Sequence, residues 1–229
     1  IIGIGLIGSS LARALKSKPG LVKKIIVSDS NKENLAKALE LGIADSTCEN
    51  LNDAVSNSDC VILCTPIGTY AEIVKKIAHS LPAGCVLSDV GSVKAKPIEN
   101  IVRYLPSNVH LVPGHPIAGT EKSGPESGFV GLFKGGWCIL TPDKKANSSS
   151  IKLVKNMWKS VGMKVDIMDP NHHDLVLAIT SHIPHIIAYS IVGTVSNLEK
   201  SSSIFFKFLQ FTPTIVGLSS LIAKRFFLS

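Results

Sequence analysis

The sequence predicts an α/β protein in which a Rossmann-type domain with a mostly parallel sheet precedes an all-helical domain. Short apolar, β-branched runs alternate with amphipathic stretches, the order expected of βαβ units. The runs lack polar alternation, as strands do when they are buried on both faces. The alternation stops near residue 169, where a long and largely apolar helical stretch begins. We therefore expect a dinucleotide-binding domain over 1–168 and a helical dimerisation and substrate domain over 169–229.

The expected elements follow the apolar pattern in chain order. Strands are predicted over 1–4, 25–28, 60–65, 85–89, 109–112, 137–141 and 163–168. Helices are predicted over 6–17, 31–41, 69–80, 95–104 and 149–161, and one long helix follows "DP" at 169–170. This order predicts a parallel sheet that is covered by helices.

Composition excludes several classes of protein. The chain has 229 residues, 45% of them apolar, and a formal net charge of +7. Its basic residues are scattered and do not form the basic stripe with interleaved aromatic residues that is typical of nucleic-acid-binding proteins. The excess of positive charge suits an anionic small molecule as substrate or cofactor. The long helical stretch carries Ser181, His182 and His185, which are costly in lipid. We therefore expect no nucleic acid and no membrane as partners, and a homodimer whose core buries this stretch.

The five cysteines lie mostly in or beside apolar runs, where a free thiol acts as a small hydrophobic group. No Cys-x-x-Cys spacing is present, which argues against a disulfide framework and against a metal site. These features favour a reducing, cytoplasmic location. The chain opens inside a predicted strand and without Met, so we expect a few residues to be missing at its start.

A glycine-rich loop follows the first predicted strand and opens a helix. "GIGLIG" matches the dinucleotide fingerprint G-x-G-x-x-G, and Gly3, Gly5, Leu6, Ile7 and Gly8 are predicted to bind the cofactor. The first glycine permits the turn, the second admits the pyrophosphate, and the third lets the helix pack closely. The helix N-terminus attracts the phosphate charge. A glycine turn without a ligand is the alternative.

Asp29 ends the next strand, about 20 residues after the third glycine, where a carboxylate accepts hydrogen bonds from ribose hydroxyls. It would repel a 2′-phosphate, and Ser30 rather than an arginine follows it, so NAD is favoured over NADP. Thr65 and Pro66 follow a later strand at the edge where the cofactor lies. We expect them to line the nicotinamide ribose, with a plain turn as the alternative.

Two further strand ends carry catalytic candidates. In "SDVGSVK", Ser92 and Lys94 are predicted to point into the cofactor crevice, with a surface-loop position as the alternative for both. In "GHPIAGTEKSG", His115 is predicted to lie on a rigid loop with Thr120 and Glu121, which a small acid could use. A neutral imidazole accepts a hydroxyl proton near neutral pH, so His115 is the candidate base.

Four motifs, "GxGLIGSS", "DVGSVK", "GHPIAGTEKSG" and "SHIPHIIAYS", together resemble the prephenate/arogenate dehydrogenase family of tyrosine biosynthesis over about residues 1–199. The resemblance implies an NAD-dependent oxidoreductase that acts as a homodimer. It would oxidatively decarboxylate prephenate (or arogenate) to 4-hydroxyphenylpyruvate (or tyrosine).

The resemblance also implies roles for particular residues. His115 would bind the C4 hydroxyl of the substrate and help to take its proton, and Ser92 would support both groups. His182 and His185 would lie near the substrate, with His185 as the contact, and Glu121 would belong to a gating or ionic network. From the residues alone, the two helical histidines could equally be core side chains with satisfied hydrogen bonds.

The last thirty or so residues depart from the family pattern. The family carries a "GFRDFTR"-like motif whose arginine grips a substrate carboxylate, and residues 200–229 contain no such motif and no acidic residue. We expect an atypical tail in a truncated or frameshifted family member. The alternatives are a non-catalytic dinucleotide-binding or dimerisation module, and a β-hydroxyacid dehydrogenase, which generally relies on a lysine in the helical domain.

Overall fold

The computed structural model describes residues 1–120, 122–184, 186–187 and 189–190. The chain divides into two compact units, Ile1–Pro170 and Asn171–Ser229. The predicted domain boundary lies at residue 168, close to this division. Residues 200–229, the predicted atypical tail, lie outside the described residues.

A parallel sheet forms the centre of the first unit. Its strands are β1 (Ile26–Val27), β2 (Ser46–Thr47), β3 (Cys60–Leu63), β4 (Val86–Asp89) and β5 (His110–Leu111). Ile2 makes isolated parallel bridges to Ser28 and to Leu63, which places the N-terminal segment between β1 and β3. The spatial order is therefore β2, β1, the Ile2 segment, β3, β4, β5. This is the doubly wound order that binds dinucleotides beyond the strand ends where the order reverses.

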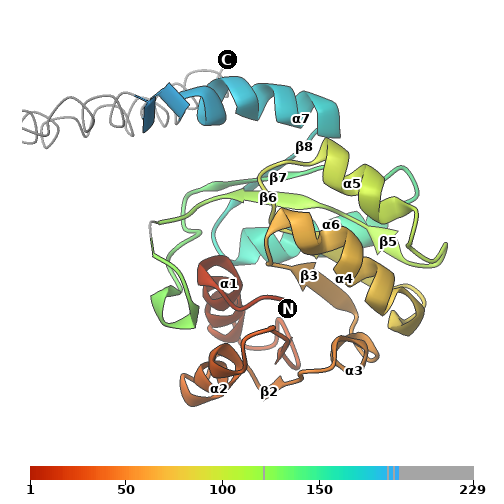
Figure 1. Ribbon diagram of the computed structural model, residues 1–229, viewed down its shortest axis with the longest axis vertical. Coiled ribbons are helices and arrows are strands. Elements are labelled where there is room, and N and C mark those ends of the chain that lie inside the picture. The colour runs from red at the N-terminus through yellow and green to blue at the C-terminus, as the bar shows by residue number, and fades with distance from the viewer. Residues whose placement is uncertain (121, 185, 188, 191–229) are drawn as a thin grey trace, which may run out of the picture. The chain divides into compact units, whose positions relative to one another are not determined.

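Helices cover both faces of this sheet (Figure 1). They are α1 (Leu6–Lys16), α2 (Lys32–Glu40), α3 (Leu51–Val55), α4 (Tyr70–Ile77), α5 (Ala95–Val102) and α6 (Ser148–Ser160), with short 3-10 turns at Ile67–Thr69, Ala78–Ser80 and Pro125–Ser127. Alternate residues of β3 face opposite ways, because successive strand side chains point to opposite faces. Ile62 packs in one core cluster with Leu11 of α1 and Trp158 of α6. Leu63 packs in the other with Val74 of α4 and Ile101 of α5.

A smaller sheet extends the first unit. It contains β6 (Gly114–Ile117), β7 (Trp137–Leu140) and β8 (Lys164–Ile167), with β6 antiparallel to β7 and β7 parallel to β8. The predicted loop is wrong for 114–117, which form a strand. The predicted strand over 1–4 is reduced to the bridge at Ile2, and the short β2 and α3 were not predicted. The other predicted strands and helices are present with shifted ends.

The described part of the second unit is helical. Helix α7 (Pro170–Leu177) runs into a π-helical turn (Ala178–His182), and the described residues remain helical to Ser190. This agrees with the long helix predicted after residue 169. Among the described residues, no helix is long and apolar enough to cross a membrane.

Candidate active site

The glycine loop is shaped by close contacts between its own backbone and the end of β3. Gly3 has φ 92°, and a Cβ there would lie 2.8 Å from the Cys64 carbonyl and 2.9 Å from Thr65 Cγ2. A Cβ on Gly8 would lie 2.2 Å from the Gly3 carbonyl oxygen. Side chains at either position would therefore force α1 away from the strand, so the loop requires glycine at both.

Gly5 differs from the other two glycines because its Cβ position is open. No described heavy atom lies within 4 Å of it. Gly5 precedes α1, whose first turn contains Leu6, Ile7 and Gly8 and, within this described helix, no acidic side chain and no side-chain cap. Backbone N–H groups at a helix start attract an anion when no protein group takes them. The open space and the free helix end fit a dinucleotide pyrophosphate.

Asp29 fixes the loop from the end of β1. Its Oδ2 accepts a hydrogen bond of 2.8 Å from the Ile4 N–H, and its Oδ1 accepts one of 2.9 Å from the Asn31 N–H. The Asn34 side chain adds a contact of 3.4 Å to Oδ1. Two carboxylate oxygens can accept about four hydrogen bonds, so capacity remains for a ribose hydroxyl. The same residue therefore orients the loop and can still bind a ligand.

The turn after β3 lies against the glycine loop. Thr65 is half-buried and its Oγ1 accepts a hydrogen bond of 2.9 Å from Thr69 Oγ1. Pro66 is exposed and leads into the 3-10 turn Ile67–Thr69. Because Thr65 Cγ2 would contact a side chain at Gly3, the structure brings the two predicted cofactor segments together.

His115 lies on β6 and pairs with Ile139 of β7. His115 is 8% exposed, so it is a nearly buried residue rather than one on a surface loop. The segment after β6 is a loop in which Thr120 is exposed and accepts a hydrogen bond of 3.2 Å from the Lys122 N–H. Glu121 lies outside the described residues.

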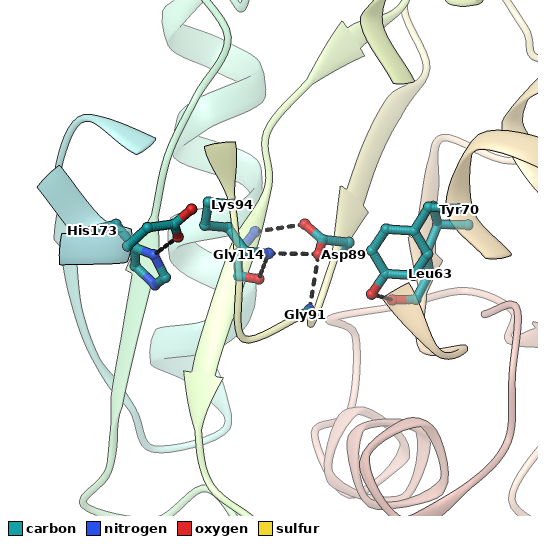
Figure 2. A network of polar contacts seen from close by, with 8 residues as sticks. Leu63, Tyr70, Asp89, Gly91, Lys94, Gly114 and His173 are labelled. Atoms are coloured by element: carbon teal, nitrogen blue, oxygen red, sulfur yellow. Dashed lines mark hydrogen bonds and ion pairs between the residues drawn. The ribbon is translucent and has the colours of Figure 1, made fainter. Parts of the chain in front are cut away.

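The turn after β4 holds Ser92 and Lys94 in different surroundings. Ser92 is exposed, whereas Lys94 is only 1% exposed, so the surface-loop alternative is wrong for Lys94. Lys94 Nζ forms an ion pair of 2.5 Å with Asp89 Oδ2 and donates a hydrogen bond of 2.7 Å to the Gly114 carbonyl (Figure 2). The sequence indicates Lys94 as a candidate but not its pairing with Asp89. The five-residue spacing of Asp and Lys around Gly-Ser was the available signal.

In the second unit, His182 ends the π-helical turn and is half-buried, and His185 lies outside the described residues. His173 is fully buried, and its Nδ1 lies 2.8 Å from Asp174 Oδ1 (Figure 2). In the described parts of both units, no group of three or more His, Cys, Asp or Glu residues could hold a metal ion.

The five cysteines are free thiols. Burial raises the pKa of Cys60 and Cys64 to about 12 and that of Cys85 to about 11. These thiols therefore stay protonated near neutral pH, which suits packing rather than nucleophilic chemistry.

The strand order, the glycine loop and the carboxylate after β1 define a Rossmann-type nucleotide-binding protein. The profile of the prephenate dehydrogenase nucleotide-binding domain matches residues 11–167, and that of the prephenate dehydrogenase dimerization domain matches 169–211. The chain belongs to the prephenate dehydrogenase family. The family match therefore continues into the first residues of the predicted atypical tail.

Relatives and solved structures agree with this assignment. The cyclohexadienyl dehydrogenase of Zymomonas mobilis is 40% identical over 88% of this chain and 68% of its own length. The prephenate dehydrogenase of Bacillus subtilis is 35% identical over 87% of this chain, which spans only 54% of that relative. A crystal structure of Aquifex aeolicus prephenate dehydrogenase with hydroxyphenyl propionate and NAD+ is 36% identical, with a TM-score of 0.82 over 97% of this chain and 76% of the other.

Proposed function

We propose that this protein is an NAD-dependent oxidoreductase that oxidatively decarboxylates prephenate (or arogenate) to 4-hydroxyphenylpyruvate (or tyrosine) in tyrosine biosynthesis. The observation that carries the proposal is the similarity to the Aquifex aeolicus enzyme in complex with NAD+ and hydroxyphenyl propionate. That ligand is a phenol with a three-carbon acid side chain, as is 4-hydroxyphenylpyruvate. We further propose that the protein is cytoplasmic and forms a homodimer through residues 169–229, which the match to the dimerization domain supports.

Cofactor binding is assigned to the glycine loop and its neighbours. Gly3, Gly5 and Gly8, with Leu6 and Ile7 in the first turn of α1, cradle the pyrophosphate, and the open Cβ position of Gly5 supports this. Asp29 binds the adenosine ribose and disfavours the 2′-phosphate of NADP, and Thr65 and Pro66 line the nicotinamide ribose. NAD supplies a hydride acceptor.

His115 and Ser92 perform the proton chemistry in this proposal. His115 accepts the proton of the C4 hydroxyl while the C4–H bond breaks and its electron pair leaves as hydride. The C1–carboxylate bond then breaks, its electrons enter the ring, and CO2 departs. The oxygen on C4 of the aromatic product then takes the proton back from His115. Ser92 orients His115 and the hydroxyl, so the residues mainly supply position and one base.

Substrate binding is assigned to Ser92 and His115 together with Thr120, Glu121, His182 and His185. The two substrates differ in a keto or an amino group on the side chain, which leaves the choice between them to experiment. The same ring chemistry serves both, because C4 and C1 are unchanged.

The test is a comparison of the parent chain with His115→Asn. Parent protein should produce NADH from NAD with prephenate, arogenate or both. His115→Asn should lower kcat by at least about a hundredfold, the range of a general base, while the Kd for NAD stays within about twofold. NADH production that is unaffected by the substitution would remove His115 from the mechanism. NAD binding without any turnover of either substrate would instead identify a non-catalytic module.

A further inference from the structure

We propose that Asp89 and Lys94 form a positioning pair that holds Gly114, the residue before His115, against the turn that carries Ser92. The inference rests on the proposed function, because it assigns the pair to the geometry of that reaction. Neither residue contacts the substrate in this proposal. Both act through the two candidate catalytic residues.

Asp89 joins the turn after β4 to the start of β6 through one carboxylate. Its Oδ2 accepts a hydrogen bond of 2.8 Å from the Gly91 N–H, next to Ser92, and its Oδ1 accepts one of 3.3 Å from the Gly114 N–H, next to His115. Figure 2 shows these contacts converging from the end of β4 and the start of β6. A Cβ on Gly91 would lie 2.9 Å from Asp89 Oδ2, so the turn closes this tightly only with glycine.

Lys94 binds the same residue, Gly114, at its carbonyl. Its Nζ donates a hydrogen bond of 2.7 Å to the Gly114 carbonyl oxygen and also pairs with Asp89 Oδ2. Gly114 is therefore held at its N–H, in the peptide from Pro113, and at its C=O, in the peptide to His115, by a pair of opposite charges. Charge-assisted hydrogen bonds are shorter and stronger than neutral ones, so they restrict the peptide that orients His115.

The burial of the pair argues that its role is specific to this geometry. The side chains of Lys94 and Asp89 are 1% and 5% exposed. A buried ion pair recovers its desolvation cost only with good geometry and further hydrogen bonds. Apolar residues of similar size in its place often give a fold that is at least as stable. Here three further hydrogen bonds of the pair go to the backbone of Gly91 and Gly114, the residues before Ser92 and His115. A small displacement of a positioned group can reduce a rate about a hundredfold.

The test is a double-mutant cycle between Lys94→Met and His115→Asn, with kcat, KM and the Kd for NAD measured for each protein. Lys94→Met should lower kcat about ten- to a hundredfold, with the Kd for NAD within about twofold of the parent. In the His115→Asn background, Lys94→Met should change kcat by less than about threefold, because the imidazole that it positions is gone. Independent, multiplying effects would overturn the proposal.

Ile77→Ala is the matched control for general loss of stability. Ile77, the last residue of α4, is fully buried in the core cluster that contains Leu63 and has no assigned role. Ile77→Ala should lower the stability of the fold, but it should not reproduce the loss of kcat that depends on His115. Equal loss of kcat in this control would show that Lys94 has only a structural role.

A second measurement separates this proposal from the proposed function. The ring signals of His115 in an NMR spectrum, assigned by their loss in His115→Asn, should shift or broaden in Lys94→Met but not in Ile77→Ala. This holds even if the chain turns over neither substrate, and unchanged ring signals would overturn the pair's role. If Lys94→Met does not fold, Asp89→Asn carries the same expectations, because it keeps the side-chain shape and removes the charge.

Discussion

At the scale of single residues, the three fingerprint glycines are required for different physical reasons. Gly3 adopts φ 92° beside Cys64, and Gly8 approaches the Gly3 carbonyl too closely for any side chain. Gly5 has neither constraint, since its Cβ position is open. Two of the glycines therefore serve the fold, and the third leaves room for a ligand.

Alanine substitutions should separate these roles. Gly8→Ala should lower the free energy of unfolding by roughly 1–3 kcal/mol, because the new methyl group overpacks the helix against the loop. Gly5→Ala should change it by less than about 1 kcal/mol. It should nevertheless weaken NAD binding at least tenfold, about 1.4 kcal/mol, since the methyl group would occupy the pyrophosphate position. Urea denaturation and NAD titration measure both quantities, and equal NAD affinity in Gly5→Ala and the parent would contradict the loop's assignment.

Asp29→Asn should reduce the preference for NAD over NADP by about tenfold, or 1.4 kcal/mol. The amide keeps an acceptor oxygen for the Ile4 N–H but loses the charge that repels a 2′-phosphate. Asp45→Asn is the matched control, because Asp45 also accepts a backbone hydrogen bond, from Ile25, outside the glycine loop. Titrations with both cofactors measure the ratio. A parent protein that already binds NADP more tightly would show that the carboxylate does not select the cofactor.

At the scale of elements, β6 explains how His115 is held. Pro116 cannot donate a ladder hydrogen bond, and β6 tolerates it because it is an edge strand of the smaller sheet. The strand forms because 137–140 pair with it, and Leu140 and Cys138 bring it into the core. Its sequence suits a turn, so only the distant partner makes it a strand.

The loop between β6 and β7 is anchored on the helix that begins at the glycine loop. A Cβ on Gly128 would lie 2.1 Å from Ser9 Oγ. The Phe129 N–H donates a hydrogen bond of 3.1 Å to Ser10 Oγ. Further along, the buried Phe133 ring packs edge-on against Trp158, with ring centroids 5.3 Å apart. The segment that follows His115 is thus tied to α1 and to the core.

Gly128→Ala should therefore lower stability by roughly 1–3 kcal/mol and weaken NAD binding, because it pushes the loop away from the start of α1. Gly131→Ala is the control on the same loop, since the nearest described atoms to its Cβ lie 3.8 Å away, an ordinary contact. Thermal unfolding with and without NAD measures both effects. Identical behaviour of the two variants would mean that the loop does not support the cofactor helix.

At the scale of the whole molecule, the second unit presents an apolar surface in a single chain. Leu175, Ile179, Ile183 and Ile186 recur at helical spacing and are 60%, 58%, 48% and 63% exposed. Exposed apolar area of this kind marks an interaction surface. This surface supports the homodimer proposed above.

Ile179→Lys should shift the protein from dimer towards monomer, because a buried, unpaired ammonium opposes association. Light scattering across a concentration series measures the shift. Leu39→Lys on α2 is the control, since Leu39 is 47% exposed in the first unit and should leave the oligomeric state unchanged. A parent protein that is monomeric at every concentration would contradict the dimer.

The sequence by itself determined the fold class, the glycine loop and most of the helices. These depend on local patterns: apolar runs, helical spacing, and glycines that a tight loop requires. It also indicated His115 and Ser92 as candidates from their places after strands, and the resemblance to the family agreed with the matching profiles. Which residues bind substrate stays a prediction.

Only the tertiary structure decided that His115 lies on a nearly buried strand and that Lys94 pairs with Asp89 against the Gly114 peptide. The sequence could not show this, because both outcomes depend on partners far along the chain. Pairing with 137–140 overrides the turn preference of "GHPI", and a lysine enters the interior only where a carboxylate and a carbonyl meet its charge. Long-range pairing and burial are set by the assembled fold, whereas propensity is set by neighbours in sequence.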